Sequence, residues 1–383
     1  MSILLGVTAA KVFSTIGYII VALLTLMVMI VIHEFGHYIV GKIFKFKINE
    51  FAIGFGPPIF RFMTRNGEYF SIRPIPLGGF CAFEGEDADS EIKGSFNSQA
   101  PWKRILVLLA GVTFNIFSAF LILGICFSTY GYTLPKVAGF YDSTDSSFVQ
   151  TLQQDDIIYE LNGKKIYALN SFNVSSIIEK AESNTMDCIV IRNGEKVKIQ
   201  VTVAEFSYPV YSEDCYDENG QLIEGSIASE TKTYSGLGIQ TATTLYRLDF
   251  GDALVKGIVY CGQIIVFLFQ TIGGIFVGKV AISGSLGGPL TTVSVLANTI
   301  SYTGFRGVLM LLGMMSANVA IFNILPIPAL DGCKILFTLI EWIRGKPINR
   351  KVEAIISTVG LILLFAMTII FDILNLSWIW SLY

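Results

Sequence analysis

The stretch from residue 12 to residue 32 carries no charged side chain and ends directly before His33. As an α-helix, its roughly 21 residues span about 31 Å, which is enough to cross the hydrocarbon core of a bilayer. A signal peptide is the alternative interpretation, but the run is long and leads into His33 rather than into a small-residue cleavage site. The sequence therefore predicts a membrane-spanning helix that delivers a histidine to its end.

Further apolar runs predict a protein with several spans. Charged residues make up only 15% of the chain, against about a quarter in soluble domains. Three more uncharged runs are long enough to cross, which places the predicted spans at about 12–38, 105–130, 307–330 and 354–374. A fifth apolar run, 257–278, is rich in glycine and contains two glutamines. It fits either a fifth span or an amphipathic helix at the interface, and we favour the interface.

The distribution of lysine and arginine supports four spans. These residues gather in loops 41–103 and 334–353, and none follows Asp372. By the positive-inside rule both loops are cytoplasmic and both termini lie outside. Four spans satisfy this arrangement, and five do not.

The only two histidines of the chain, His33 and His37, lie four residues apart with Glu34 between them. On a helix this spacing places both imidazoles on one face, about one turn apart. The pattern H-E-x-x-H is typical of zinc sites in which the glutamate is the general base. A pair of helix histidines satisfied by hydrogen bonds is the structural alternative. Because ionisable groups at membrane depth are costly, we favour the metal site.

A third protein ligand must be a carboxylate or a thiolate, because no other histidine exists. Asp331 closes the third predicted span on the same side of the membrane, and two histidines with one carboxylate are a known catalytic zinc set. Pro326 and Pro328 precede it and should loosen the helix, which is tolerated where the chain lines a cavity. Cys333 is the competing ligand, and a simple helix-ending Asp-Gly is the structural alternative.

Two regions outside the spans have strand patterns. In 131–205 we predict a small β-rich domain with a strand at 157–161, a helix near 171–182, and a hairpin around Asn193-Gly194. The following residues, 206–235, look like a polar insertion without periodicity. Between the first two spans, 67–85 predicts a β-hairpin, either an ordinary cytoplasmic one or one that offers an edge to an extended peptide.

Charge and cysteine content narrow the function classes. The net charge of −3 argues against nucleic acid as a partner. The six cysteines form no C-x-x-C pair, although Cys188 and Cys215 could form a bridge if their region faces an oxidising side.

Several short motifs occur in a characteristic order. They are HEFGH at 33–37, GFGP at 54–57, IPLGGF at 75–80, Ala110-Gly111 with Asn115, Gly288-Pro289, and NILPIPALDG at 323–332. With these motifs the chain resembles the site-2 protease family of intramembrane zinc metalloproteases, most closely the bacterial regulator of sigma-E protease type with a single PDZ domain. Three positions depart from the family pattern: Cys333 replaces a glycine, Val112 replaces a proline, and 152–158 lacks the usual PDZ glycines.

The resemblance implies a site. His33, His37 and Asp331 would bind Zn²⁺, and Glu34 would be the general base. The resemblance also implies contacts with substrate from Asn115, Asn323, Gly78, Gly79 and Phe80. From the residues alone, an asparagine inside a membrane helix equally well holds helices together.

The resemblance also implies an organisation. The expected fold is an α-helical polytopic membrane protein with about four transmembrane helices, an inserted β-rich PDZ-like domain and a membrane-associated β-hairpin. The expected domains are a first half of the membrane core (1–130), the PDZ-like domain (131–205), a polar insertion and linker (206–250), an interfacial helix and loop (251–300), and the second half of the core (301–383).

The expected function is regulated proteolysis in the bacterial inner membrane, with the active site near the cytoplasmic face and the PDZ-like domain outside. Substrates would be single-pass membrane proteins such as anti-sigma factors or signal-peptide remnants, first cut by an upstream site-1 type protease. A catalytically inactive scaffold with a PDZ domain and a metal transporter are the alternatives. A transporter usually carries ionisable residues on several spans and internal repeats, which this chain lacks.

Overall fold

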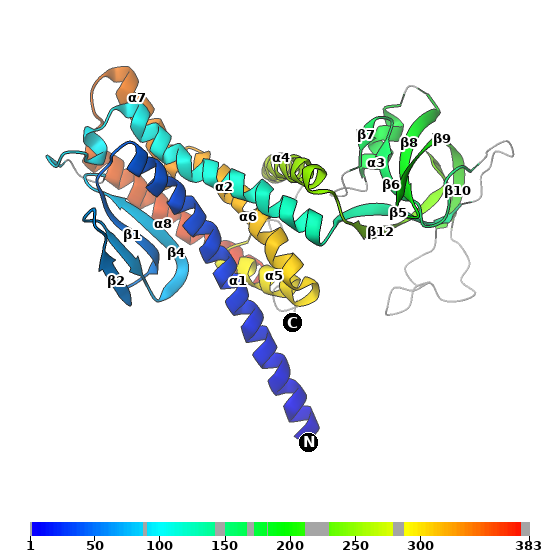
Figure 1. Cartoon of the computed structure of the whole chain (residues 1–383), viewed down its shortest axis with the longest axis horizontal. Coiled ribbons are helices and arrows are strands. Elements are labelled where there is room, and N and C mark those ends of the chain that lie inside the picture. Colours follow the sequence, from blue (N-terminus) through cyan, green and yellow to red (C-terminus); the bar gives the residue numbers. More distant parts are fainter. Residues whose placement is uncertain are drawn as a thin grey trace. The chain divides into compact units, whose positions relative to one another are not determined.

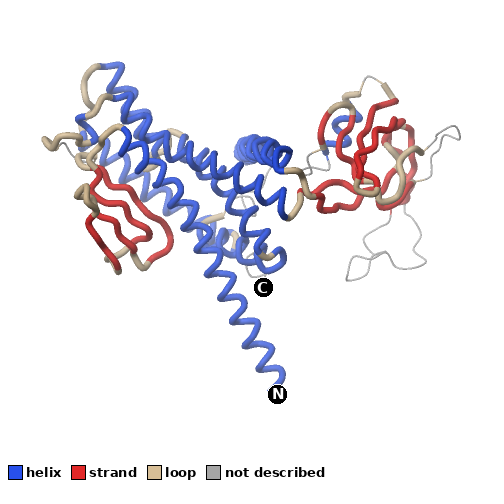
Figure 2. The backbone as a smooth tube through the Cα atoms, in the orientation of Figure 1, coloured by secondary structure: helices blue, strands red, loops and turns tan. Residues whose placement is uncertain are grey.

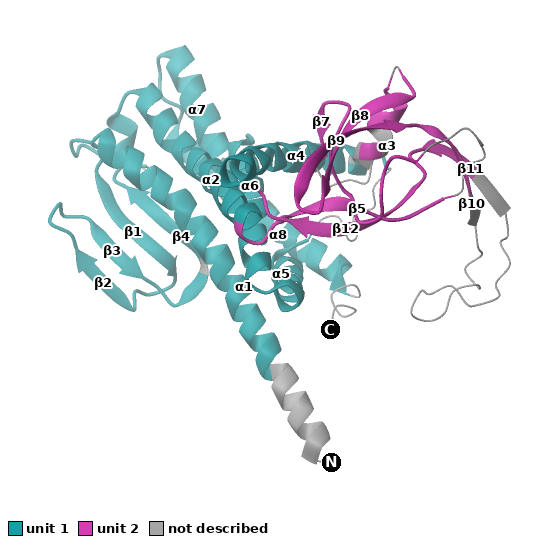
Figure 3. Cartoon of the chain, turned by 45° about the vertical axis from the view of Figure 1, so that its right-hand side comes forward, with its two compact units in different colours: residues 1–128, 249–383 teal, residues 129–248 magenta. Residues whose placement is uncertain are grey.

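The computed structural model describes residues 2–86, 90–141, 150–166, 172–181, 183–210, 230–278 and 287–376. The chain divides into two compact units (Figure 3). Unit 1 comprises Met1–Ser128 and Asp249–Tyr383, and unit 2 comprises Thr129–Leu248.

Unit 1 is built mainly from helices (Figure 1). They are α1 (Ser2–Ile43), α2 (Pro101–Thr129), α4 (Phe250–Phe276), α5 (Pro289–Thr303), α6 (Phe305–Ile324), α7 (Asp331–Arg344) and α8 (Arg350–Leu374). By length and composition, five helices of the described chain could cross a membrane: the segments Phe13–Ile43, Pro101–Thr129, Phe250–Ile275, Phe305–Ile324 and Arg350–Leu374. Four of them coincide with the predicted spans. The fifth, in α4, covers most of the run 257–278 that we favour as interfacial, and it is long enough for either placement.

The third predicted span is shorter than 307–330. Helix α6 ends at Ile324, and Leu325 is extended (φ −68°, ψ 144°). The residue before a proline avoids the helical region, which explains this end before Pro326. The sequence predicts that Asp331 ends the third span, and this prediction is wrong. Asp331 is the first residue of α7. Neither α7 nor α5, which lies in the predicted loop, was anticipated.

Unit 1 also contains a four-stranded sheet, not a hairpin. Its strands are β1 (Ile48–Phe55), β2 (Phe60–Met63), β3 (Tyr69–Ile72) and β4 (Ile75–Phe83), in the order β2-β3-β1-β4. The predicted hairpin at 67–85 is wrong because β1 lies between β3 and β4: Phe51 faces Phe70 in a parallel pair and Cys81 in an antiparallel pair. Phe51 packs in a buried cluster with Phe46, Ile48 and Val107, which holds β1 in the centre. Strand β4 is an edge strand and contacts α1.

Unit 2 is a β-rich domain with one described helix (Figure 2). Its elements are β5 (Tyr132–Phe140), β6 (Ile157–Leu161), β7 (Lys164–Lys165), α3 (Phe172–Glu179), β8 (Thr185–Arg192), β9 (Glu195–Thr202), β10 (Ala204–Val210), β11 (Glu230–Gly236) and β12 (Ile239–Tyr246). The main sheet has the order β12-β5-β6-β8-β9, with β7 paired to β6. Its core consists of fully buried aliphatic side chains, among them Val137, Ile158, Leu161 and Val190.

Sequence patterns predicted the middle of unit 2 well and its end poorly. The strand at 157–161, the helix near 171–182 and the hairpin are present. Asn193 (φ 53°) and Gly194 (φ 86°) both take the positive φ that a tight hairpin turn requires. However, β10 and β11 lie at the ends of the predicted polar insertion, and β12 completes the main sheet from the predicted linker. The unit therefore extends beyond residue 205. Cys188 is a buried free thiol, and Cys215 lies outside the described residues.

Candidate metal centre

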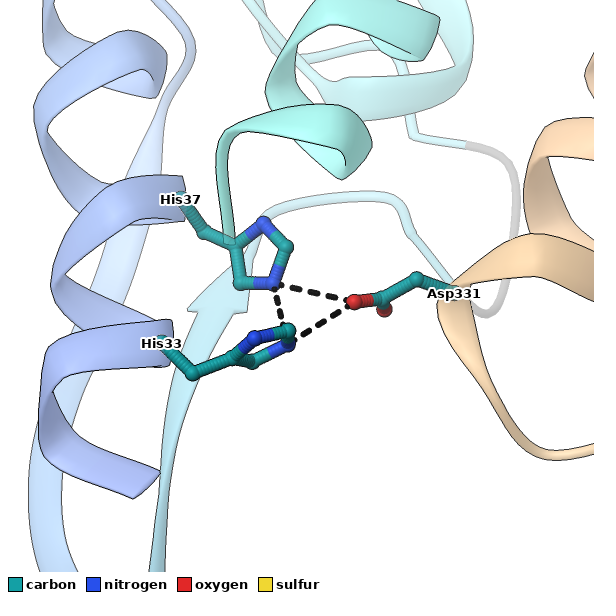
Figure 4. A group of neighbouring side chains, drawn as sticks. All are labelled: His33, His37 and Asp331. Carbon is teal, nitrogen blue, oxygen red and sulfur yellow. Dashed lines mark hydrogen bonds and ion pairs between the residues drawn. The ribbon is translucent and has the colours of Figure 1, made fainter. Parts of the chain in front are cut away.

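Three side chains from two distant segments converge on one point (Figure 4). His33 and His37 project from the same face of α1, and Asp331 reaches them from the first turn of α7. Oδ2 of Asp331 lies 2.9 Å from Nε2 of His33 and 3.2 Å from Nε2 of His37. The two Nε2 atoms are 3.1 Å apart. Both histidines are buried and the Asp331 side chain is 19% exposed, so the three ligand atoms form a compact group that solvent reaches only on the side of Asp331.

Helix α2 fixes His37 through the other ring nitrogen. Nδ1 of His37 lies 2.8 Å from the carbonyl oxygen of Val107 and must donate its proton to that oxygen. In the neutral ring this leaves Nε2 unprotonated and directed at Asp331. A carbonyl that orients a histidine in this way is the usual support for a metal ligand.

Asn115 performs the same task for His33. Its side-chain amide is fully buried, with Nδ2 3.3 Å from Nδ1 of His33, and its Oδ1 has no hydrogen-bond partner. Oxygen and nitrogen of a side-chain amide are nearly indistinguishable in shape, and exchanging them turns Oδ1 toward Nδ1 of His33. Oδ1 then accepts the Nδ1 proton of His33, and Nε2 is left as a lone-pair donor. With its amide in this orientation, Asn115 would hold His33 in the tautomer that binds a metal.

Two glycines bring α1 and α2 close enough for these contacts. A Cβ atom on Gly111 would lie 2.5 Å from Nε2 of His37 and 2.7 Å from Cε1 of His33. A Cβ atom on Gly36 would lie 2.5 Å from the carbonyl oxygen of Ala110. Both distances are shorter than real side chains tolerate, so any larger residue would push the helices apart. The space that Gly111 leaves open is the space beside the imidazoles.

Glu34 connects this centre to the sheet. Its Oε2 accepts a hydrogen bond of 3.0 Å from the backbone N–H of Cys81 in β4. Glu34, His37 and Asp331 also line a cavity of about 330 Å³ together with Phe80 and Lys334. The cavity therefore holds a carboxylate, two of the three candidate ligands and part of an edge strand.

The sequence model of Peptidase family M50 matches residues 21–367. The chain belongs to this family. It is 29% identical to a "putative zinc metalloprotease" of Fusobacterium nucleatum, with 95% of this chain and 99% of that protein covered. A protein of Clostridium perfringens with the same description is 28% identical (93% and 97% covered), and one of Agrobacterium fabrum is 26% identical (92% and 94% covered).

Family membership decides the broad class. The chain is a metallopeptidase of the site-2 protease family, its metal is zinc, and its apolar helices make it a multi-pass membrane protein. It does not favour the scaffold or the transporter alternatives. The residues present fit the metal, because two imidazoles and a carboxylate are ligand types that zinc accepts, and their donor atoms all lie within 4.8 Å of one another.

Cys333, the competing ligand, is not part of the group. It is buried in the first turn of α7, and burial raises the pKa of its thiol, which disfavours the thiolate that metals bind. Burial by itself also raises the pKa of Asp331. The charges and hydrogen bonds of His37 and His33 outweigh this effect and hold the pKa of Asp331 below its usual value.

The predicted substrate residues have different placements in this M50 peptidase. Phe80 lines the cavity, and a Cβ atom on Gly79 would lie 3.9 Å from Cγ of Glu34 and 2.7 Å from the carbonyl oxygen of Ala52. Gly78 is packed against the ring of Phe55. In the described chain, Asn323, near the end of α6, does not line this cavity and is not one of the three residues of the metal group.

Sequence reasoning missed an ion pair at the rim of the same cavity. Nζ of Lys334 lies 2.6 Å from Oε1 of Glu86, and both side chains line the cavity. In the sequence, Lys334 is only one of the positive charges of the predicted loop 334–353. Its position three residues after Asp331 is a usable signal, because on a helix it lies on nearly the same face as the ligand.

Proposed function

We propose that this chain hydrolyses peptide bonds in membrane-spanning substrates, with zinc held by His33, His37 and Asp331 and with Glu34 as general base. One observation carries the proposal: Glu34 hydrogen-bonds to the edge strand β4 in the cavity that His37 and Asp331 also line. A base, a metal group and a surface that can hold an extended peptide thus meet in one place.

A zinc ion at this site would supply Lewis-acid chemistry, polarising the scissile carbonyl and making water more acidic. Glu34 takes a proton from the attacking water, whose oxygen bonds to the carbonyl carbon. As the carbon–nitrogen bond breaks, Glu34 passes the proton to the leaving nitrogen. Asn115 and the Val107 carbonyl keep the imidazoles in place throughout.

Strand β4 can hold the peptide that is cut. A substrate helix hides its carbonyls in hydrogen bonds, so it must unwind before hydrolysis. An unwound segment can add to the free edge of β4 by main-chain hydrogen bonds. Gly78 and Gly79 keep this part of β4 free of side chains, and Phe80 offers an apolar contact.

Unit 2 would screen substrates. Its β-rich architecture with α3 is compatible with a PDZ-like domain, and the positive-inside rule places it on the outer face of a bacterial inner membrane. In that topology α4 lies at the interface and four helices cross. Substrates would be single-pass proteins such as anti-sigma factors or signal-peptide remnants, already shortened by a site-1 type protease.

Replacing Glu34 with glutamine tests the mechanism. The variant should bind zinc normally but cleave a membrane-anchored reporter at least about 10²-fold more slowly, because the amide cannot accept the proton. Glu195→Gln, an exposed change in unit 2, is the matched control and should have full activity. Unchanged cleavage by Glu34→Gln would contradict the proposal.

Removing unit 2 tests the screening role. Tyr132 in β5 pairs with Tyr246 in β12, so the two chain ends leave the unit side by side and a short Gly-Ser linker can replace 133–245. The shortened enzyme should cleave the trimmed reporter at a similar rate and also accept untrimmed forms. Complete inactivity with zinc still bound would argue against a screening role.

A further inference from the structure

A second cavity, of about 240 Å³, lies where α1 ends and β1 begins. Its lining includes four lysines, Lys42, Lys45, Lys47 and Lys93, and a single acidic residue, Glu68. It shares no lining residue with the catalytic cavity. We call these four lysines and their cavity the lysine pocket.

Glu68, the acidic residue that lines the lysine pocket, already has hydrogen-bond and ion-pair partners. The buried carboxylate of Glu68 accepts hydrogen bonds from Nζ of Lys42 at 2.7 and 2.9 Å and from the hydroxyl of Tyr38 at 2.9 Å. Lys45, Lys47 and Lys93 form no ion pair with any residue that the structure describes. Three positive charges therefore surround one concave space and have no ion-pair partner among the described residues.

Lys47 also feels the charge of Glu84, but that carboxylate has other partners. Asn49 and Ser90 donate hydrogen bonds of 2.8 and 2.7 Å to it. Glu84 thus forms no ion pair with Lys47, and its hydrogen bonds come from residues that do not line the pocket.

Lys45 occupies a position that favours glycine. After the last turn of α1, the N–H of Phe46 bonds to the carbonyl of Gly41 and the N–H of Lys45 to that of Lys42. This pattern ends a helix with one residue in the left-handed region, and Lys45 takes it with φ 60°. A lysine there costs free energy that a glycine would not. Such a cost points to a role for the side chain.

The pocket lies at the level of a membrane interface. Ile43, which is 66% exposed, is the last residue of the candidate span of α1 and lies in the sequence between Lys42 and Lys45 of the pocket. Phe44 packs edge-on against Trp102 at the start of α2, with 5.4 Å between ring centroids. Tryptophan is enriched at bilayer interfaces. The lysines thus have an exposed apolar border on the side of the span.

We propose that the lysine pocket binds the headgroup of an anionic phospholipid. Three ammonium groups suit a phosphodiester, and basic clusters next to a membrane span are the usual recognition element for anionic lipids. The exposed side chains of Ile43 and Trp102 give the acyl chains an apolar surface, which a free phosphate would not need. The occupant is therefore a lipid of the leaflet in which α1 ends.

The test is native mass spectrometry of the full-length protein in detergent, titrated with phosphatidylglycerol or phosphatidylcholine. The wild type should bind phosphatidylglycerol more tightly. Each lysine near an anionic surface contributes about fivefold in affinity. The triple variant Lys45→Gly, Lys47→Gln and Lys93→Gln should therefore bind it at least tenfold more weakly. Lys42 is kept, because it neutralises Glu68.

Two controls separate the pocket from total charge and from folding. Replacing Lys164, Lys180 and Lys196 of unit 2 with glutamine removes the same charge and should leave lipid binding unchanged. Lys45→Gly alone should weaken binding about fivefold without lowering the unfolding temperature, because glycine adopts φ 60° freely.

Three results would overturn the proposal: equal phosphatidylglycerol binding by the triple variant, equal binding of the two lipids by the wild type, or displacement of the lipid by an equal concentration of inorganic phosphate. None of them bears on the peptidase chemistry, because the substituted lysines do not line the catalytic cavity.

Discussion

The two units differ in the polar side chains that they bury and in the apolar ones that they expose. In unit 2 the interior is aliphatic, with Val137, Ile158 and Leu161 fully inaccessible. In unit 1 the helices bury polar groups such as Asn115, Ser316 and Arg104. Helix α8 leaves its apolar residues on the outside: Ile355, Val359, Ile362, Leu363, Phe365, Ile369 and Ile370 are exposed.

This contrast shows that each unit is arranged for a different solvent. In water, burial of apolar area drives folding, so the aliphatic residues of unit 2 lie inside. In lipid, exposing a leucine side chain costs no free energy, whereas exposing a polar group costs roughly several kcal/mol. The polar residues of unit 1 therefore lie inside. A catalytic site built from charged side chains can therefore exist within the apolar helices only at their interior contacts.

The largest effect should come from removing a ligand in the polar interior of unit 1. Asp331→Ala leaves two histidines, which bind zinc weakly. Losing the several kcal/mol by which the metal lowers the activation free energy should slow cleavage about 10³-fold. Metal analysis and a cleavage assay measure both consequences. Asp187→Ala, an exposed change in unit 2, serves as control. Full zinc content and activity in Asp331→Ala would remove Asp331 from the site.

Next in size is a cavity in the aliphatic interior of unit 2. Leu161→Ala should lower the free energy of unfolding by about 3–5 kcal/mol. The same change at Leu363, on the outer face of α8, should cost less than about 0.5 kcal/mol in a detergent micelle. Thermal unfolding of both variants compares the two solvents directly. A similar loss at both positions would show that α8 is packed against protein, not lipid.

The convergence of His33, His37 and Asp331 was predictable from the sequence because most of its signals are local. The spacing of His33 and His37 follows from helix geometry, and zinc's need for a third ligand of another type directed attention to Asp331. Hydropathy likewise located the long helices, since lipid imposes a length on them.

The remaining features depend on contacts between distant segments, which no local pattern reports. The position of β1 between β3 and β4 is set by packing of Phe51, and the hairpin prediction failed there. The support of His33 by Asn115 joins residues on two different helices. The start of α7 at Asp331 depends on the turn after Pro328, not on the apolar run itself.

A smaller effect is expected from the buried ion pair of unit 1. Oε2 of Glu341 lies 2.7 Å from Nη2 of Arg104, and both side chains are buried. Arg104→Met should destabilise the protein by about 3 kcal/mol, the low end for such a loss, because Arg350 still pairs with Glu341. The double variant with Glu341→Met should regain part of this stability. If its loss equals or exceeds the sum of the single losses, the pair is not coupled as the contacts indicate.

The smallest effect should be a pH dependence that the aliphatic core of unit 2 does not have. Burial raises the pKa of Glu341, but the N–H of Ile348 and the charges of Arg104 and Arg350 outweigh it, so the pKa lies below the usual 4.5. A lowered folded-state pKa gives stability that is complete above pH 4.5 and is lost as the pH falls through the folded value. Each pKa unit by which folding lowers the pKa of Glu341 stabilises the folded protein by about 1.4 kcal/mol.

The unfolding temperature of the wild type should therefore decrease more steeply below pH 4.5 than that of Glu341→Gln, whose other carboxylates are the same. Parallel curves for the two proteins would mean that Glu341 titrates as it does in the unfolded chain and that its buried contacts add nothing to its ionised form.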